Sequence, residues 1–302
     1  MSDFRADRFA SLYFVRPFRH LMFRRNQLRI PILMYHSISE SSQTSVHPYF
    51  AVETSPRVFA AQMEFLHDNH YCTISPADVI ALLSTGQTDG KKYVVITFDD
   101  GYRDFYTQAF PILNKLGMTA TVYLPTAFIK QKSAPFKGKE CLTWAEVREL
   151  HNAGIEFGSH TVNHPTLTGL CHAELERELR RSKDKIENEL SCAVQSFAYP
   201  YAFPEQDREF VHRLRDLLMA TGYNNGVSTI LGTVQSLDER YFLKRVPANS
   251  WDDVKFFEAK IEGNYDWLHN VQYLKKLIRQ RLAGVPVRNL AADQAKSFGT
   301  GH

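Results

Sequence analysis

Short apolar segments alternate with helical segments along the chain, and this alternation constrains the fold more than any other feature of the sequence. The segment YVVITF, at 93–98, is apolar without interruption, as is typical of a parallel strand buried on both faces. The other strand-like segments are 30–36, 119–125, 155–160, 195–200, 222–229 and 241–247. The segments between them carry apolar residues at helical spacing, and one starts with a capping box of Thr143 and Glu146. This order predicts a parallel α/β sheet or barrel.

Polar residues gather at or just beyond the carboxyl ends of the strand-like segments. They are His36, Asp99, Asp100, His160, His164, Tyr201 and Arg245. The carboxyl ends of a closed parallel barrel share one rim, where active sites are built, so we expect these side chains to meet there. The adjacent carboxylates of Asp99 and Asp100 would repel each other, and burial would strengthen that repulsion. A bound cation is the simplest feature that would offset it.

The sequence GSHTVNHP supplies two further candidate ligands for such a cation. His160 and His164 are four residues apart, but the glutamate of an HExxH helix is missing, and Pro165 disfavours helix at His164. Two histidines and one carboxylate form a three-ligand site with an open position, which favours zinc and also fits cobalt, nickel or manganese. One aspartate would be the ligand, and the other would accept a proton from the activated water.

Each of these motifs also has a purely structural interpretation. A pair of aspartates at a strand end can cap a helix or lie on the surface. Most HxxxH pairs bind no metal, and His36 alone is typical of a core histidine with satisfied hydrogen bonds. The metal site is therefore inferred from the shared rim and not from any single motif.

Composition and charge exclude several classes of protein. The four cysteines among the 302 residues are scattered without a CxxC pair, so neither a disulfide framework nor a cysteine metal site is expected. Residues 1–29 hold seven arginines against two aspartates, and the remainder has no basic surplus, so a nucleic-acid partner is not expected. Neither a secretory signal nor a membrane-spanning run is seen. A cytoplasmic location is therefore expected.

Three regions are expected along the chain: a basic aromatic arm at 1–29, a catalytic domain at 30–285 and a flexible tail at 286–302. The arm mixes aromatics with arginines, so it either packs on the domain or lies on an anionic membrane surface at the inner face. Residues 37–52 and 128–140 are polar and are expected to form irregular loops. The sequence leaves the oligomeric state open.

The motifs TFDDGYRD (97–104), HTVNH (160–164) and FAYPY (197–201), in this order, resemble the polysaccharide deacetylases of carbohydrate esterase family four. The resemblance covers roughly residues 30–250. It implies a distorted (β/α)7 barrel, a divalent metal that is commonly zinc, and removal of N- or O-acetyl groups from sugars. LMYHSI (33–38) resembles the early histidine motif of the biofilm poly-N-acetylglucosamine deacetylases, in which the motif order is circularly shifted.

The resemblance also implies roles for individual residues. Asp99 corresponds to the general base, and the metal ligands correspond to Asp100, His160 and His164. The backbone N–H of Tyr201 corresponds to an oxyanion donor.

The chain departs from the family pattern at two places. Ala198 stands where the family usually has an arginine, and we interpret Arg245 as the replacement that orients Asp99, with a surface ion pair as the alternative. The family's late histidine is not evident, so His36 is the candidate general acid, with a structural role as the alternative.

Three functions are compatible with these motifs. The first is a metal-dependent deacetylase acting on a polysaccharide, an oligosaccharide or a lipid-linked glycan of surface-polysaccharide synthesis. The second is a metal-dependent amide or formyl hydrolase on a different small substrate, and the third is a non-catalytic sugar-binding barrel. Tyr102, Trp144 and Tyr201 are candidates for stacking on a sugar ring.

Overall fold

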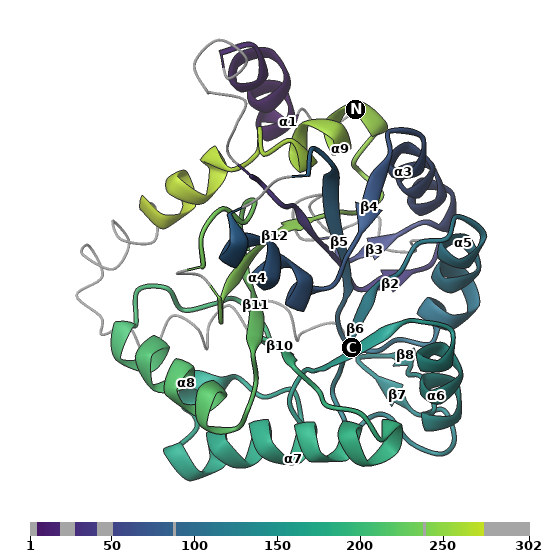
Figure 1. The fold of residues 1–302 in the computed structure, drawn as a ribbon, viewed down its shortest axis with the longest axis vertical. Coiled ribbons are helices and arrows are strands. Elements are labelled where there is room, and N and C mark those ends of the chain that lie inside the picture. The colour runs from purple at the N-terminus through teal and green to yellow at the C-terminus, as the bar shows by residue number, and fades with distance from the viewer. Residues whose placement is uncertain (1–4, 19–27, 41–50, 87–88, 238–239, 275–302) are drawn as a thin grey trace.

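The structure is a computed structural model, and it describes the chain except for residues 1–4, 19–27, 41–50, 87–88, 238–239 and 275–302. The tail expected at 286–302 therefore lies outside the described residues. Figure 1 shows the strands gathered into a central ring, with most of the helices around it.

A closed barrel of seven parallel strands forms the centre of the molecule. The strands, in spatial order, are β1 (Ile32–Tyr35), β12 (Leu243–Pro247), β11 (Asn225–Leu231), β10 (Ser196–Ala198), β9 (Glu156–Ser159), β6 (Thr121–Leu124) and β5 (Lys92–Phe98). The ring closes because β1 pairs with both β12 and β5. The expected (β/α)7 barrel is confirmed, and each of the seven strand-like segments contributes one strand.

Five short strands lie outside the ring. They are β4 (Tyr71–Thr73), β2 (Ser37–Ile38), β3 (Glu53–Thr54), β7 (Pro135–Phe136) and β8 (Lys139–Glu140). Strand β4 pairs with the first half of β5, whereas β1 takes the second half. The segment expected to be an irregular loop at 37–52 begins with β2, which pairs in parallel with β3 just beyond it, and the one at 128–140 contains the antiparallel β7–β8 hairpin, so that expectation is wrong in part.

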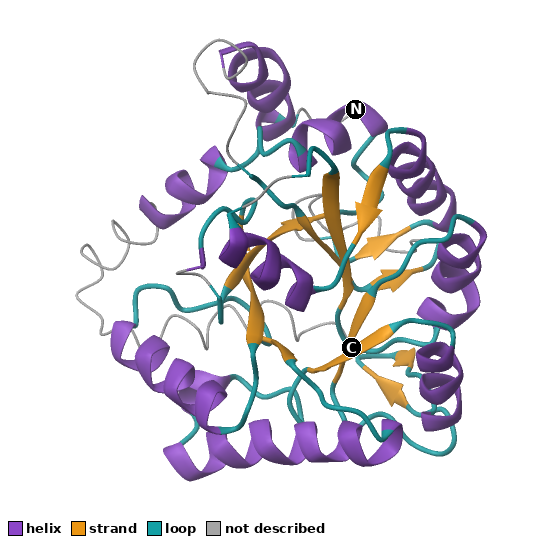
Figure 2. Ribbon diagram, in the orientation of Figure 1, coloured by secondary structure: helices purple, strands orange, loops and turns teal. Residues whose placement is uncertain are grey.

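Helices cover the outside of the barrel (Figure 2). The α-helices that lie wholly within the described residues are α1 (Ala6–Ala10), α3 (Pro56–Asp68), α4 (Pro76–Thr85), α5 (Phe110–Lys115), α6 (Trp144–Asn152), α7 (His172–Leu190), α8 (Arg208–Ala220) and α9 (Val254–Ile261). The π-helical segments are η1 (Ser11–Val15) and η3 (Phe105–Ala109), and η4 (Leu167–Gly169) is a 3-10 turn. The predicted capping box is confirmed at α6, where Thr143 accepts from the Glu146 N–H and Glu146 accepts from the Thr143 N–H.

The interior of the barrel changes from apolar to polar along the strands. At the amino end, Val79 and Ile80 of α4 pack with Ile32, Val95 and Leu243, and α4 crosses the middle of the ring in Figure 1. Towards the carboxyl end, successive inward-facing positions of β5 and β12 carry threonine, aspartate and arginine instead. The barrel therefore presents a polar layer at the rim where its active site was expected.

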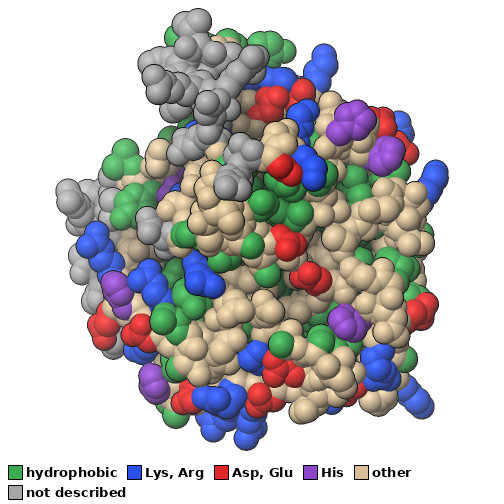
Figure 3. All heavy atoms as spheres, in the orientation of Figure 1, with side chains coloured by type: hydrophobic (Ala, Val, Ile, Leu, Met, Phe, Trp, Pro, Cys, Tyr) green, Lys and Arg blue, Asp and Glu red, His purple; other side chains and the backbone are tan. Residues whose placement is uncertain are grey.

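The N-terminal arm packs on the domain through its arginines. Arg8 pairs with Asp253 at 2.6 Å, and Arg16 pairs with Glu258 at 2.9 Å. Lysine and arginine side chains are interspersed with acidic ones on the face shown in Figure 3. None of the helices in the described part of the chain is long and apolar enough to cross a membrane.

Candidate functional site

The turn after β5 presents two carboxylates in different directions. Asp99 continues the strand, and its N–H donates to Tyr35 O of β1 at 3.0 Å. Asp100 and Gly101 then adopt positive φ angles of 68° and 59°. A Cβ at Gly101 would lie 2.9 Å from Leu124 Cδ2, so glycine satisfies both the conformation and the space. Because of this turn, the carboxylates of the adjacent residues Asp99 and Asp100 can contact different groups.

Arg245 holds Asp99 inside the barrel. Its Nη1 and Nη2 atoms each donate to one Asp99 carboxylate oxygen at 2.7 Å, and its Nε donates to Ser228 O at 2.8 Å. Arg245 is 0% exposed, which excludes the surface ion pair. Burial opposes ionisation of Asp99, but the charge of Arg245 and its hydrogen bonds outweigh it and lower the pKa to about 2. The Asp99 carboxylate is thus ionised and fixed in orientation.

Asp100, His160 and His164 bring three potential ligand atoms together. One ligand atom from each side chain lies within 4.8 Å of the others, and all three residues are buried. Asp100 Oδ1 lies 3.2 Å from His164 Nε2 and 3.6 Å from His160 Nε2, and no group of the described residues other than these two candidate ligands approaches it as a donor. A buried carboxylate oxygen without a donor needs another partner. Two imidazoles and one carboxylate suit a divalent transition metal such as zinc, so the residues present fit the expected ion.

Neighbouring groups orient the two imidazoles. His160 Nδ1 lies 2.8 Å from Ala198 O, so this nitrogen carries the proton and Nε2 keeps a free lone pair. Burial lowers the pKa of His160 to about 3, although nearby Asp99 raises it, so the ring is neutral. Glu178 of α7 accepts from the backbone N–H groups of Val162 and Asn163, at 2.8 and 2.9 Å, and thereby holds the turn between the histidines.

His36 lies beside Asp99, as the shared rim predicts. Its Nε2 is 3.9 Å from Asp99 Oδ2, and its side chain is 21% exposed. Burial lowers the pKa of His36, although Asp99 and Asp100 act in the opposite direction. The neutral imidazole is therefore favoured before any reaction, so a role as acid requires that the ring gain a proton during turnover.

Tyr201 reaches the site with its backbone in the left-handed region, at a φ of 60°. Its ring packs edge-on against His164, with the centroids 4.5 Å apart. Among the hydrogen bonds of the described residues, the Tyr201 carbonyl accepts from Thr229 Oγ1 at 3.1 Å, and its N–H has no acceptor. The N–H is thus available to a ligand, as an oxyanion donor must be.

Lys137 and Tyr102 both contact the Asp100 carboxylate, and the sequence motifs did not predict this contact for either residue. Lys137, between β7 and β8, places Nζ 3.2 Å from Asp100 Oδ2, and Tyr102 Oη donates to the same oxygen at 3.0 Å. Both donors occupy Oδ2 and leave Oδ1 for another partner. Lys137 stands in a segment without a recognisable motif, whereas the position of Tyr102 next to the aspartates was a usable signal.

For two of the three residues predicted to stack on a sugar ring, the structure shows that the prediction is wrong. Trp144 is 2% exposed and Tyr102 is 5% exposed, so neither ring can offer a face to a sugar. Trp144 begins α6 and packs in the core. Tyr201 keeps partial exposure at the rim.

Comparisons with known proteins agree with this geometry. A family model described as polysaccharide deacetylase matches residues 86–223. The chain is 32% identical to YxkH of Bacillus subtilis, whose name describes it as a polysaccharide deacetylase, over 78% of this chain and 77% of YxkH. It is also 30% identical to the poly-beta-1,6-N-acetyl-D-glucosamine N-deacetylase of Escherichia coli K12, over 43% of this chain and 20% of that protein.

Among solved structures, the Streptococcus pyogenes deacetylase PplD, determined in complex with acetate, superposes with a TM-score of 0.69 at 28% identity. The superposition covers 78% of this chain and 99% of PplD. The similarity therefore extends over most of both chains and is not confined to the motifs around Asp99, Asp100, His160 and His164.

Proposed function

The chain belongs to the polysaccharide deacetylase family and is a carbohydrate deacetylase, and from this premise we propose that it uses a divalent metal to remove acetyl groups from N-acetylated sugars. The observation that carries the proposal is the buried group of Asp100, His160 and His164 next to a carboxylate clamped by Arg245. Three ligands with an open position are typical of a catalytic metal site.

The proposed reaction assigns one task to each group around the site. Asp100, His160 and His164 would hold a cation that polarises the acetyl carbonyl and makes water more acidic. Asp99 accepts the proton of the attacking water, because Arg245 keeps its carboxylate ionised and fixed in orientation.

The remaining groups stabilise the developing oxyanion, protonate the leaving amine and hold Asp100 in position. The backbone N–H of Tyr201 donates to the oxygen on which negative charge develops. When acetate leaves, the sugar amine needs a proton: the one that Asp99 took from the water passes to His36, whose Nε2 lies 3.9 Å from Asp99 Oδ2, and His36 gives it to the amine, so both side chains return to their starting states. Lys137 and Tyr102 keep Asp100 in place through its second oxygen.

The proposed substrate is a glycan that contains N-acetylglucosamine. The Escherichia coli relative carries such a substrate in its name, and the early histidine motif resembles that of the same enzymes. The proposal includes polysaccharide, oligosaccharide and lipid-linked forms of the glycan, with zinc as the favoured metal.

The proposal is tested by acetate release from β-1,6-linked N-acetylglucosamine oligomers. Purified protein is assayed as isolated, after removal of metal with a chelator, and after zinc is restored. We expect release that stops with chelation and returns with zinc, and that Asp99→Asn lacks. Asp216→Asn, an exposed aspartate on α8, is the matched control and should behave as the wild type. Formate in place of acetate, or release that survives chelation, would contradict the proposal.

A further inference from the structure

The β7–β8 hairpin ends in a two-residue turn whose backbone conformation does not favour its first residue. Lys137 and Gly138 both have positive φ angles, of 49° and 79°. Two successive positive angles are the pattern of a type I′ turn, in which asparagine, aspartate or glycine is favoured and other side chains are strained. The backbone of the turn therefore gives no reason for a lysine, and the reason must lie in what its side chain contacts.

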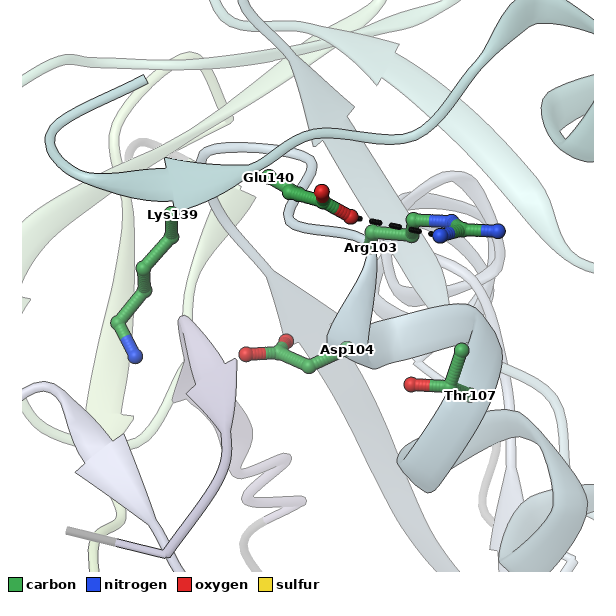
Figure 4. A pocket seen from close by; sticks show the side chains of 5 residues that line it. All are labelled: Arg103, Asp104, Thr107, Lys139 and Glu140. Atoms are coloured by element: carbon green, nitrogen blue, oxygen red, sulfur yellow. Dashed lines mark hydrogen bonds and ion pairs between the residues drawn. The ribbon is translucent and has the colours of Figure 1, made fainter. Parts of the chain in front are cut away.

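The hairpin is held in place at its base. The Arg103 N–H donates to Glu140 O at 2.8 Å, and Figure 4 shows the Arg103 guanidinium beside the Glu140 carboxylate, 3.3 Å away. Lys139 Nζ contacts Glu53 Oε1 at 2.8 Å and Ser39 Oγ at 3.0 Å. These contacts join the hairpin to the segment that follows β5 and to the β2–β3 region, so the turn at its tip has a fixed place on the rim.

From this turn, the ammonium group of Lys137 reaches the metal site. Its Nζ donates to Asp100 Oδ2 at 3.2 Å and lies 4.7 and 5.1 Å from the ring centroids of Phe136 and Tyr201. The same two rings pack against the imidazole of His164, with centroids 5.3 and 4.5 Å away. The ammonium group therefore lies on the side of the site that carries Tyr201, whose backbone N–H is the proposed oxyanion donor.

Lys137 can contact a ligand as well as Asp100. An ammonium group has three donors, and among the described residues Nζ donates to Asp100 Oδ2 and to no other acceptor. The Lys137 side chain is 39% exposed, whereas that of Asp100 is 4% exposed. Tyr102, which donates to the same oxygen, is buried. Of these two donors, Lys137 is the one that a ligand at the rim can reach.

The proposed reaction creates negative charge beside this ammonium group. Addition of water to the acetyl carbon, with one proton passing to Asp99, leaves a single negative charge on the former carbonyl oxygen. Breakage of the C–N bond, with the nitrogen protonated by His36, re-forms the C=O bond and releases acetic acid, which ionises to acetate. Arg245 is fully buried and bound to Asp99. Among the described residues that contact the site, Lys137 is therefore the cationic side chain that an anion can approach.

We propose that Lys137 is a further catalytic residue, whose ammonium group donates to the acetyl oxygen as negative charge develops there and then binds the acetate that forms. This inference rests on the proposed function and adds a charged side-chain donor to the backbone N–H of Tyr201. A hydrogen bond between two charged groups is stronger than one to a neutral carbonyl. The contact therefore stabilises the transition state more than it stabilises the bound substrate.

Steady-state kinetics with the β-1,6-linked tetramer of N-acetylglucosamine, at saturating zinc, test the role in turnover. Lys137→Met should lower kcat at least about tenfold with little change in KM, because the lost contact forms in the transition state. Lys137→Arg keeps a positively charged donor and should recover most of this loss. Lys185→Met on α7 is the matched control and should keep the wild-type kcat, because Lys185 likewise combines a carboxylate, Glu189 at 2.6 Å, with an aromatic ring, Trp144 at 5.1 Å.

Titration of acetate into the zinc-loaded proteins, followed by the NMR line width of its methyl protons, gives a readout without turnover. Lys137→Met should bind acetate about tenfold more weakly than wild type, the value of one hydrogen bond to a charged group. Lys137→Arg and Lys185→Met should bind it as wild type does. A residue that only held Asp100 in place would alter zinc affinity, measured by competition with a chelating dye, but not acetate binding at full zinc occupancy.

The two readouts separate failure of this inference from failure of the proposed reaction. If wild-type protein releases no acetate from the tetramer, the proposed reaction fails, but weaker acetate binding by Lys137→Met would still support Lys137 as the group that binds the anion. Thermal unfolding identifies any variant that has lost its fold. With folded, zinc-loaded Lys137→Met, a wild-type kcat or a wild-type affinity for acetate would overturn the inference.

Discussion

The pairing of Asp99 with Arg245 places two full charges inside a barrel, which costs desolvation that only close geometry can offset. Both carboxylate oxygens and three guanidinium nitrogens are used, at 2.7–3.2 Å. Removing one partner of a buried pair leaves the other charge without compensation, and this is more harmful than replacing both. The same hydrogen bonds therefore affect both the stability of the barrel and the orientation of the Asp99 carboxylate.

We therefore expect Arg245→Met to lower the free energy of unfolding by about 3–5 kcal/mol, because it leaves the Asp99 carboxylate buried and unpaired. Urea denaturation of the protein measures the change. The double variant Asp99→Asn with Arg245→Met should be more stable than Arg245→Met alone, since no charge remains. If the double variant is the less stable of the two, the buried charge is not the cause.

The hydrogen bond from Tyr102 to Asp100 Oδ2 is a second residue-scale feature with a measurable effect. Loss of such an outer partner typically costs 10–100-fold in metal affinity. We expect Tyr102→Phe to weaken zinc binding by about that factor, as measured by competition with a chelating dye. Tyr106→Phe removes a hydroxyl that contacts the exposed Glu149 and is the control. Equal affinities of the two variants would show that this hydrogen bond does not position the ligand.

Most of the site could be predicted at the residue scale, because strand ends and motif order fix where the side chains emerge. Arg245 could be identified as a candidate because Ala198 leaves no cation at the usual position. Lys137 could not be identified from the sequence, because its position depends on the β7–β8 hairpin. Each strand of that hairpin has only two residues. Such short strands have no periodicity to recognise.

At the scale of elements, the seven barrel strands were predictable because each is an apolar run between helical segments. Strand β4 was missed, since its three residues are only half-buried.

What the sequence does not show is how side chains of adjacent strands fill the barrel interior. The ring of Tyr123 on β6 passes directly over Gly158 on β9, and its hydroxyl is fixed by Ser196 Oγ of β10 at 2.7 Å.

Gly158→Ala should therefore destabilise the barrel, although the backbone there suits any residue. The added Cβ would lie 2.4 Å from Tyr123 Cε1 and 2.9 Å from Ser196 O. Overpacking of this kind typically costs about 1–3 kcal/mol, which thermal or urea unfolding measures. Combining it with Tyr123→Leu should cost less than the two separate changes added together, because the smaller side chain makes room. Strict additivity would show that the ring is not the obstacle.

At the scale of the whole molecule, the arm is a separate layer on the outside of the barrel. The sequence left two arrangements open, and the described part of the arm packs on the domain, with Arg8 and Arg16 directed at acidic residues of the α9 region. Its aromatic residues point the other way: Phe14 is 56% exposed and Phe18 is 65% exposed. Contact with a membrane surface, at the cytoplasmic face, stays a prediction, and its lipid-facing groups would be these rings.

The arm can be tested by sedimentation with vesicles that contain anionic lipid. Burying one phenylalanine contributes about 1.5–3 kcal/mol, so Phe14→Ser with Phe18→Ser should lower the partition constant onto the vesicles at least about tenfold. Met219→Ser, which removes an exposed apolar side chain from α8, should have no effect. Equal recovery of wild type and the double variant would remove the arm as a membrane contact and leave it as a support for α9.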